Sequence, residues 1–329
     1  MNHIAKCYAY TFGFITFLMF LYGSVRELVG RGIYLQNIET WPVTQAGTLP
    51  LQVSCITRSG DTQSMIDRTN ERLAAGDDIV MWSEAAGGYF EASPDLFEWN
   101  SENTGAAVVS TYISPVGGNA VDAYNAMTIM QNGQEVSRYY KNRPVPLVEP
   151  NIIPGPTLPN VTSLTLTPKS SSSSGRQPVS LKTSMAICFD FDFSYLFQDA
   201  SNADIVLGPS GYWASIGFVV WEHNIFRAIE NGFTIIKCAE NGVTGAVDPY
   251  GRALAAVPTS DNEVHLMEVP VQNGVFTLFR ACGWVFGWMC VFLSPVVLVL
   301  FVWEKIRQKK RTSSPSQEAA VPYYCRTMS

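Results

Sequence analysis

Between residues 50 and 270, short apolar runs alternate with segments of helical periodicity. Residues 51–56 and 78–82 have the pattern of buried strands, and residues 62–75 between them carry apolar side chains on one helical face. A strand, a helix and a strand at this spacing predict a βαβ unit with parallel strands. Further strands are predicted at 106–113, 124–130, 135–140, 184–188, 203–207, 233–238, 243–247, 253–257 and 264–269, with a second helix at 218–231. The pattern predicts one α/β domain in which helices cover two packed sheets.

Two longer apolar segments flank this domain, at 7–25 and 283–303. They hold 19 and 21 residues without a charge, and about 20 helical residues cross a hydrocarbon core. We therefore predict that both are transmembrane helices. A cleaved signal peptide is the alternative for the first segment, and a buried core helix is the alternative for the second. The uninterrupted length of the second segment and the basic residues after it favour a membrane span.

The charge pattern orients the two predicted spans. Five of the eight residues that follow the second span are Lys or Arg, so the positive-inside rule places the tail, residues 304–329, in the cytoplasm. The short N-terminus, residues 1–6, is then cytoplasmic as well. The linker 26–49 and the domain 50–270 are expected on the other side of the membrane, in a lumen, the periplasm or the exterior.

Composition narrows the classes of function. The chain has 22 Lys and Arg residues against 28 Asp and Glu residues, a net charge of −6, and 47% apolar residues. These values exclude a disordered chain and a basic protein that coats nucleic acid. Nucleotide-binding and zinc-protease motifs are absent from the sequence, so we expect no cofactor. The predicted domain is acidic and the only basic run follows the second apolar segment, so we expect no nucleic-acid partner. The triplet Asn160-Val161-Thr162 fits the acceptor pattern for N-glycosylation.

Three cysteines fall within the predicted domain: Cys55, Cys188 and Cys238. Because three is an odd number and no C-x-x-C spacing occurs, we expect neither a disulfide framework nor a zinc site. A lone thiol of this kind is a candidate nucleophile.

Three residues with reactive side chains come at the ends of predicted strands or directly after them. Glu84 follows the strand 78–82, Lys141 follows the returning strand of a hairpin, and Cys188 ends the strand 184–188. Singly, each has an ordinary interpretation: a solvated acid, an exposed lysine and a small core residue. Strand ends are nevertheless where α/β folds collect their ligand contacts.

Together these residues resemble the nitrilase, or carbon–nitrogen hydrolase, superfamily over roughly residues 50 to 270. Five blocks carry the resemblance in order: Met81-Trp82-Ser83-Glu84, Tyr140-Lys141, Ile187-Cys188-Phe189-Asp190, Arg227-Ala228-Ile229-Glu230-Asn231-Gly232, and the hairpin from Asn241 to Gly251. The resemblance implies a nitrilase-like four-layer αββα sandwich, here flanked by one transmembrane helix on each side. Nitrilase domains commonly associate, so it also allows a homo-oligomer.

Within the superfamily, the sequence is most similar to the apolipoprotein N-acyltransferase branch. The stretch from Lys141 to Glu149 resembles that branch's stretch from its catalytic Lys to a second Glu eight residues later. Four positions differ from the branch: Ser83 and Ser194 stand where Pro is common, Phe189 stands where Tyr is usual, and Asp190 replaces Glu. The branch also carries several membrane helices before its soluble domain, whereas one precedes this domain.

The resemblance implies a role for each residue. Cys188 would be the nucleophile, Glu84 its general base and Lys141 the stabiliser of the oxyanion, aided by the backbone N–H of Phe189. Loss of one oxyanion donor typically costs about 3 kcal/mol. Glu149 would orient Lys141 or act as a second acid, with Asp190 in support.

The resemblance leaves three functions open. A thioester intermediate would pass its acyl group to an amine, as in a membrane N-acyltransferase acting on lipid, or to water, as in an amidase acting on a small amide. The third hypothesis is that the nitrilase scaffold serves an interaction and has no catalytic activity.

Overall fold

The computed structural model describes residues 50–99, 105–117, 122–166, 178–213, 216–270 and 275–312. The predicted transmembrane segment 7–25 and linker 26–49 lie outside these residues, as does most of the tail. The chain divides into two units, residues 1–280 and 281–329. The fold of the first unit positions the candidate site.

Two six-stranded mixed sheets form this unit. The first has the order β12-β1-β2-β3-β4-β5, and the second has the order β11-β10-β9-β8-β7-β6. In each sheet three neighbouring strands are parallel, β1-β2-β3 and β7-β8-β9, and the outer pairings are antiparallel. The strands of the first sheet are β1 (Leu51–Ile56), β2 (Ile79–Trp82), β3 (Ala107–Pro115), β4 (Ala123–Gln131), β5 (Gln134–Tyr140) and β12 (Val264–Val269). Those of the second are β6 (Thr162–Leu166), β7 (Val179–Met185), β8 (Ile205–Gly211), β9 (Thr234–Glu240), β10 (Gly242–Val247) and β11 (Ala253–Thr259).

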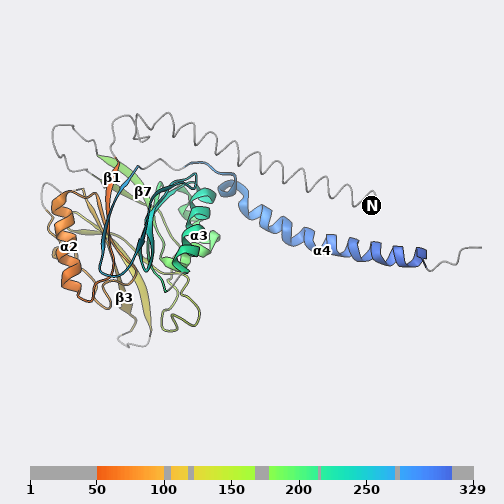
Figure 1. The fold of residues 1–329 in the computed structure, drawn as a ribbon, viewed down its shortest axis with the longest axis horizontal. Helices are drawn as coiled ribbons and strands as arrows, with labels where there is room; N and C mark the ends of the chain where they lie inside the picture. Colours follow the sequence, from red (N-terminus) through yellow and green to blue (C-terminus); the bar gives the residue numbers. More distant parts are fainter. Residues whose placement is uncertain are drawn as a thin grey trace, which may run out of the picture. The chain divides into compact units, whose positions relative to one another are not determined.

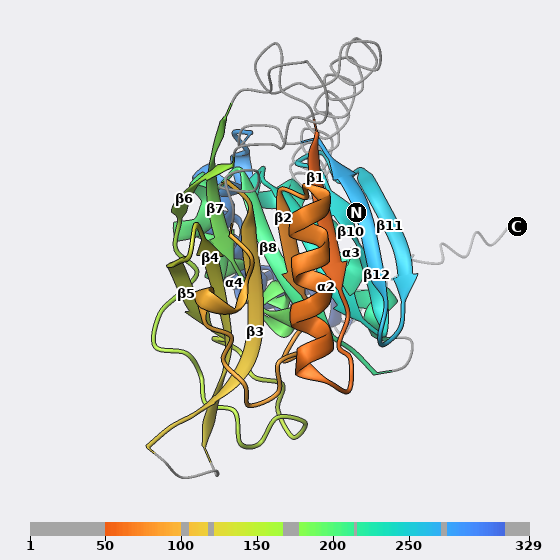
Figure 2. The same ribbon diagram turned by 90° about the vertical axis from the view of Figure 1, so that its left-hand side faces the viewer.

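One helix covers the outer side of each sheet. Helix α2 (Thr62–Ala75) packs on β1 and β2, and helix α3 (Ile216–Asn231) packs on β9 and β10. Figure 1 shows the two helices on opposite sides of the paired sheets, and Figure 2 shows α2 lying along the first sheet. The predicted αββα arrangement is therefore confirmed.

Local sequence explains the limits of α2. The Asp61 carboxylate accepts hydrogen bonds from the backbone N–H groups of Gln63 and Ser64, which caps the N-terminus. Gly76 ends the helix in the left-handed conformation, with φ of 96°. The four side chains that face the sheet are buried: Met65, Ile66, Thr69 and Leu73. These are the residues that the helical spacing places on one face.

The core between the sheets contains a disulfide that the sequence analysis did not expect. Cys55 on β1 and Cys238 on β9 are bonded, 183 residues apart in the chain, and both are fully buried. The expectation of no disulfide was wrong because it used only the count and spacing of cysteines, whereas the packing of the sheets brings the two thiols together. The disulfide joins one sheet to the other and leaves Cys188 as a free thiol.

The segment predicted as the second transmembrane helix, residues 283–303, lies within α4 (Leu278–Thr312), whose backbone departs from helical geometry at Cys282. Among the residues that the structure describes, no helix is long and apolar enough to cross a membrane.

Candidate active site

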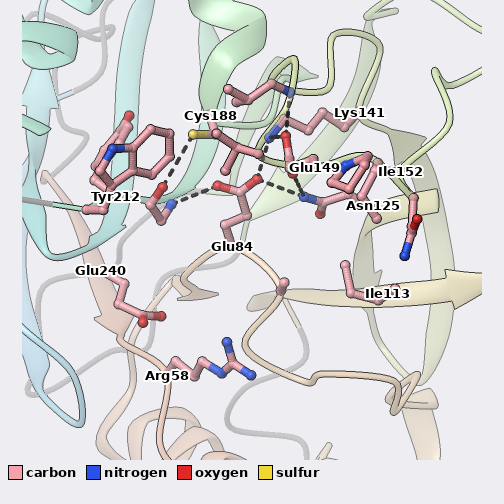
Figure 3. A pocket seen from close by; sticks show the side chains of 17 residues that line it. Arg58, Glu84, Ile113, Asn125, Lys141, Glu149, Ile152, Cys188, Tyr212 and Glu240 are labelled. Atoms are coloured by element: carbon pink, nitrogen blue, oxygen red, sulfur yellow. Dashed lines mark hydrogen bonds and ion pairs between the residues drawn. The ribbon is translucent and has the colours of Figure 1, made fainter. Parts of the chain in front are cut away.

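The three predicted residues line one cavity of about 440 Å³. Glu84 follows β2 and Lys141 follows β5, both in the first sheet. Cys188 begins a short 3₁₀ helix, η2 (Cys188–Asp192), which follows β7 of the second sheet. The cavity therefore lies where strand ends of the two sheets meet, and Figure 3 shows the three side chains gathered there.

Glu84 is held at both of its carboxylate oxygens. Oε1 accepts hydrogen bonds from Lys141 Nζ at 2.8 Å and from Asn125 Nδ2 at 2.7 Å. Oε2 accepts from the backbone N–H of Gly211 at 2.8 Å. The carboxylate therefore has a fixed orientation beside Lys141 (Figure 3). Asn125 and Gly211 were not predicted as site residues, since they lie within β4 and at the end of β8 and belong to no block of the resemblance.

Lys141 bridges two carboxylates. Its Nζ lies 2.8 Å from Glu84 Oε1 and 2.7 Å from Glu149 Oε2, and its side chain is 1% exposed. Burial alone would lower the pKa of Lys141, but the negative charges of Glu84, Cys188 and Glu149 raise it well above the usual range. Lys141 therefore stays protonated, as a fixed positive charge in the cavity.

Glu149 is anchored by the chain around it. Its Oε2 accepts a hydrogen bond from the backbone N–H of Val145 at 2.6 Å, in addition to the one from Lys141. Asn125 Nδ2 also lies 3.4 Å from Glu149 Oε1. The proline-rich segment that carries Glu149 thus contacts Lys141 through this carboxylate.

Cys188 is a buried thiol with a special backbone conformation. The residue is 4% exposed, and its φ of 48° lies in the left-handed region that non-glycine residues seldom adopt. Its Sγ donates toward the Gly211 carbonyl oxygen at 3.6 Å, so Gly211 contacts both the thiol and Glu84. Burial and the negative charge of Glu84 raise the pKa of the thiol, while Lys141 and Lys237 oppose this rise. The resting group is therefore a thiol that needs a base.

Asp190 ties the Cys188 turn to the segment after Lys141. Its Oδ1 accepts from the backbone N–H groups of Asn142 and Arg143, at 3.1 and 2.8 Å. Its Oδ2 accepts from the backbone N–H of Ile187 at 3.0 Å and from the hydroxyl of Tyr139 at 2.9 Å. Burial raises the pKa of Asp190 to about 6. This carboxylate thus fixes the spacing between the thiol and the ammonium group.

The other predicted residues lie apart from these contacts. The Phe189 ring packs edge-on against Phe193 at 5.2 Å, and the role expected for its backbone N–H stays a prediction. Asn160 is exposed. Within the described ranges, no group of three or more His, Cys, Asp or Glu side chains is arranged to hold a metal ion.

Comparison with curated proteins identifies several apolipoprotein N-acyltransferases. No family model matches the chain. The apolipoprotein N-acyltransferase of Rickettsia typhi is 28% identical over 248 residues, which cover 68% of this chain and 47% of that protein. The one of Borreliella burgdorferi is 25% identical over 134 residues, which cover 39% of this chain and 26% of that protein. The chain therefore spans less than half the length of these relatives.

Comparison with solved structures identifies amidases of the same architecture. The amidase from Nesterenkonia sp. has a TM-score of 0.50 and 18% identity, and the match covers 68% of this chain and 91% of the amidase. A variant of it, described as belonging to the nitrilase superfamily, matches with a TM-score of 0.50 and 17% identity. Another variant carries the acetamide moiety of fluoroacetamide covalently added at its active-site cysteine.

Proposed function

We propose that this chain, which has the nitrilase-superfamily fold and is distantly homologous to the apolipoprotein N-acyltransferases, is a cysteine-dependent acyltransferase. One observation carries the proposal: Glu84, Lys141 and Cys188 come from three separate strand ends and line a single cavity. A carboxylate, a buried ammonium group and a thiol in one cavity are the groups that thioester chemistry requires.

The first half of the reaction forms the thioester. Glu84 takes the proton of Cys188 as Sγ attacks the carbonyl carbon of the acyl donor, and the carbonyl oxygen becomes an oxyanion. Lys141 stabilises that charge, because it is held protonated by two carboxylates. When the tetrahedral intermediate collapses, the bond to the leaving group breaks and Glu84 returns the proton to it.

The second half transfers the acyl group. An amine attacks the thioester carbon, Glu84 accepts a proton from the amine, the C–S bond breaks, and Glu84 returns the proton to the Cys188 thiolate. Apolar side chains at the cavity mouth favour an apolar acyl donor: Trp213 is 49% exposed and Val148 is 53% exposed, and both line the cavity. We therefore favour transfer from a lipid-like donor to an amine.

Hydrolysis of a small amide is the second candidate. The cavity of about 440 Å³ is large enough for a small ligand as it stands. Water would then take the place of the amine in the second half. Product analysis with and without an added amine separates the two: a transferase releases N-acyl amine in preference to free acid, and an amidase releases free acid in both cases.

The proposal is tested by mass spectrometry of the intact protein. After incubation with candidate phospholipids, acyl esters and small amides, we expect a mass increase equal to one acyl group, located on the Cys188 peptide and released by hydroxylamine. Cys188→Ala should abolish it, and Cys282, which is exposed and outside any disulfide, provides the internal reference for unspecific acylation. Equal labelling of both cysteines would instead support a scaffold without catalysis.

We also propose that the domain works in an oxidising, extracytoplasmic compartment. The Cys55–Cys238 disulfide supports this, because disulfides persist mainly outside reducing compartments. The basic residues after position 303 support a cytoplasmic tail. Proteinase added to intact cells with a permeabilised outer layer should cleave the domain while a C-terminal tag stays protected; the reverse pattern would contradict this topology.

A further inference from the structure

A second lysine near the candidate site has no part in the reaction described above. Lys237 lies on β9 and is fully buried. Its Nζ has no hydrogen-bond partner among the described residues. Lys141, by contrast, contacts two carboxylates. A buried ammonium group without a paired charge is costly to stability, so a fold that keeps one calls for an explanation.

The surroundings of Lys237 connect it to the nucleophile. Its Nζ lies 5.0 Å from the centre of the Tyr212 ring and 5.5 Å from that of the Phe191 ring. Tyr212 lines the cavity, and Phe191 belongs to η2, the same short helix that begins with Cys188. Two aromatic rings thus contact the ammonium group, and one of them belongs to the turn that presents the thiol.

The sheet leaves room for this arrangement. In register, Lys237 pairs with Gly208 on β8 and with Gly245 on β10. A Cβ atom on Gly208 would come within 2.8 Å of the Phe191 ring. The positions beside Lys237 on both neighbouring strands are therefore glycines, which leave space for the lysine and for the aromatic rings that contact it.

The charged groups that face Lys237 are few. Cys188 has the largest electrostatic influence on it, followed by Asp192 and Glu84. Asp192 is itself paired with His223 of α3, at 2.6 Å. Tyr212 does not supply a negative charge, because burial raises its pKa well above the usual value. Burial lowers the pKa of Lys237 to about 8, and the negative charge of a Cys188 thiolate opposes that shift.

Charge balance indicates what this lysine does. In the resting site, Glu84 and Glu149 carry two negative charges against one positive charge on Lys141. When Glu84 takes the proton of Cys188, the negative charge moves onto sulfur. That charge passes to the carbonyl oxygen only as the C–S bond forms, so before the attack it rests on sulfur. Lys141 is already shared between two carboxylates, and a second positive charge near the thiolate stabilises the state that precedes the attack.

We propose that Lys237 is a positioning residue that stabilises the Cys188 thiolate electrostatically. This rests on the proposed function, since it takes Cys188 as the nucleophile. Lys237 touches neither donor nor acceptor, and its effect reaches the reaction through the charge on sulfur.

The test compares Lys237→Met with the matched variant Lys182→Met, an exposed lysine on β7 of the same sheet. The readout is the rate of iodoacetamide labelling of the Cys188 peptide from pH 6 to 10. Below pH 8, where Lys237 is protonated, we expect Lys237→Met to label about tenfold more slowly than the wild type, which is one unit of thiol pKa, and we expect the two rates to converge above that pH. Lys182→Met should match the wild type, and labelling of Cys282 should be the same in all proteins.

Stability separates this role from a structural one. Methionine has a similar length and removes an unpaired buried charge, so Lys237→Met should melt at the wild-type temperature or above it. Lys237→Arg retains the charge and should keep the wild-type labelling rate. If Lys237→Met does not fold, the labelling rate of Lys237→Arg still tests the inference. An unchanged pH profile in a folded Lys237→Met protein overturns the inference. Absence of any acyl adduct on wild-type Cys188 would instead overturn the proposed function.

Discussion

At the scale of single residues, the site is a chain of alternating charges. Glu149, Lys141 and Glu84 follow one another at distances of 2.7 and 2.8 Å. The thiol of Cys188 comes next, and its pKa is raised by burial and by Glu84. Each group therefore sets the protonation of its neighbour, and a neutral substitution at one position changes the next.

Glu84→Gln separates thiol ionisation from acyl transfer. The carboxylate raises the pKa of Cys188, so its removal should lower that pKa and speed alkylation by iodoacetamide at neutral pH. The same variant has no base for proton transfer, and acylation of Cys188 should fall by about 10²–10⁴-fold. Both rates are measured by mass spectrometry of the Cys188 peptide.

The opposite changes in these two rates make the prediction specific. Glu98→Gln, at an exposed acid in the loop between β2 and β3, serves as the control and should change neither rate. If Glu84→Gln slows alkylation and acylation equally, Glu84 holds the turn in place and is not the base.

At the scale of elements, Asp190 joins η2 to the segment that follows β5. Four hydrogen bonds converge on its two oxygens, three of them from backbone N–H groups. Because the donors belong to different parts of the chain, this one side chain sets the distance between the nucleophile turn and Lys141. Resemblance alone predicted a supporting role for Asp190, and the hydrogen bonds give that role a physical basis.

Asp190→Asn should destabilise the domain and slow acylation. An amide can accept at its oxygen only, so some of the four buried donors lose their partner, at a cost of about 1–3 kcal/mol for each. Urea unfolding measures the loss, and Asp199→Asn, an exposed position nearby, should have the stability of the wild type. A variant as stable as the wild type would show that the network is dispensable.

The pH dependence of stability provides a second prediction for Asp190. The pKa of Asp190 is raised to about 6 in the folded protein, above its ordinary value near 4. The folded state therefore holds the proton more tightly, and this contribution to stability is complete below about pH 4 and is lost as the pH rises through 6. Asp190→Asn should remove this decrease, as measured by urea unfolding from pH 4 to pH 7.

At the scale of the whole molecule, local patterns predicted the layers and most of the strands, but not every strand end. The strand predicted at 184–188 is β7, which ends at Met185, so Cys188 begins η2 and does not end a strand. The βαβ unit and the hairpin that leads to Lys141 depend on neighbouring residues, so they could be found in the sequence. Asn125, Gly211 and Lys237 could not, because each lies within or at the end of a buried strand and acts on a residue far away in the chain. Strand β6, between proline-rich and serine-rich segments, was missed because its surroundings resemble a loop.

The disulfide provides the prediction for the whole molecule. Cys55 and Cys238 join the two sheets across 183 residues, at the buried centre of the domain. Loss of a native disulfide typically costs about 2–5 kcal/mol, mainly because the unfolded chain gains freedom. The double variant Cys55→Ala/Cys238→Ala should therefore melt at a lower temperature than the wild type. Wild-type protein that is unfolded in a reducing agent should have a melting temperature close to that of the double variant.

Acylation should respond differently from stability. Neither cysteine lines the cavity, so below its melting temperature the double variant should acylate Cys188 at nearly the wild-type rate. Calorimetry with and without reductant, together with the acylation rate at 15 °C, checks both statements. A melting temperature that is equal in all three samples would mean that the two sheets are held by packing alone, and the disulfide would then no longer support an oxidising compartment.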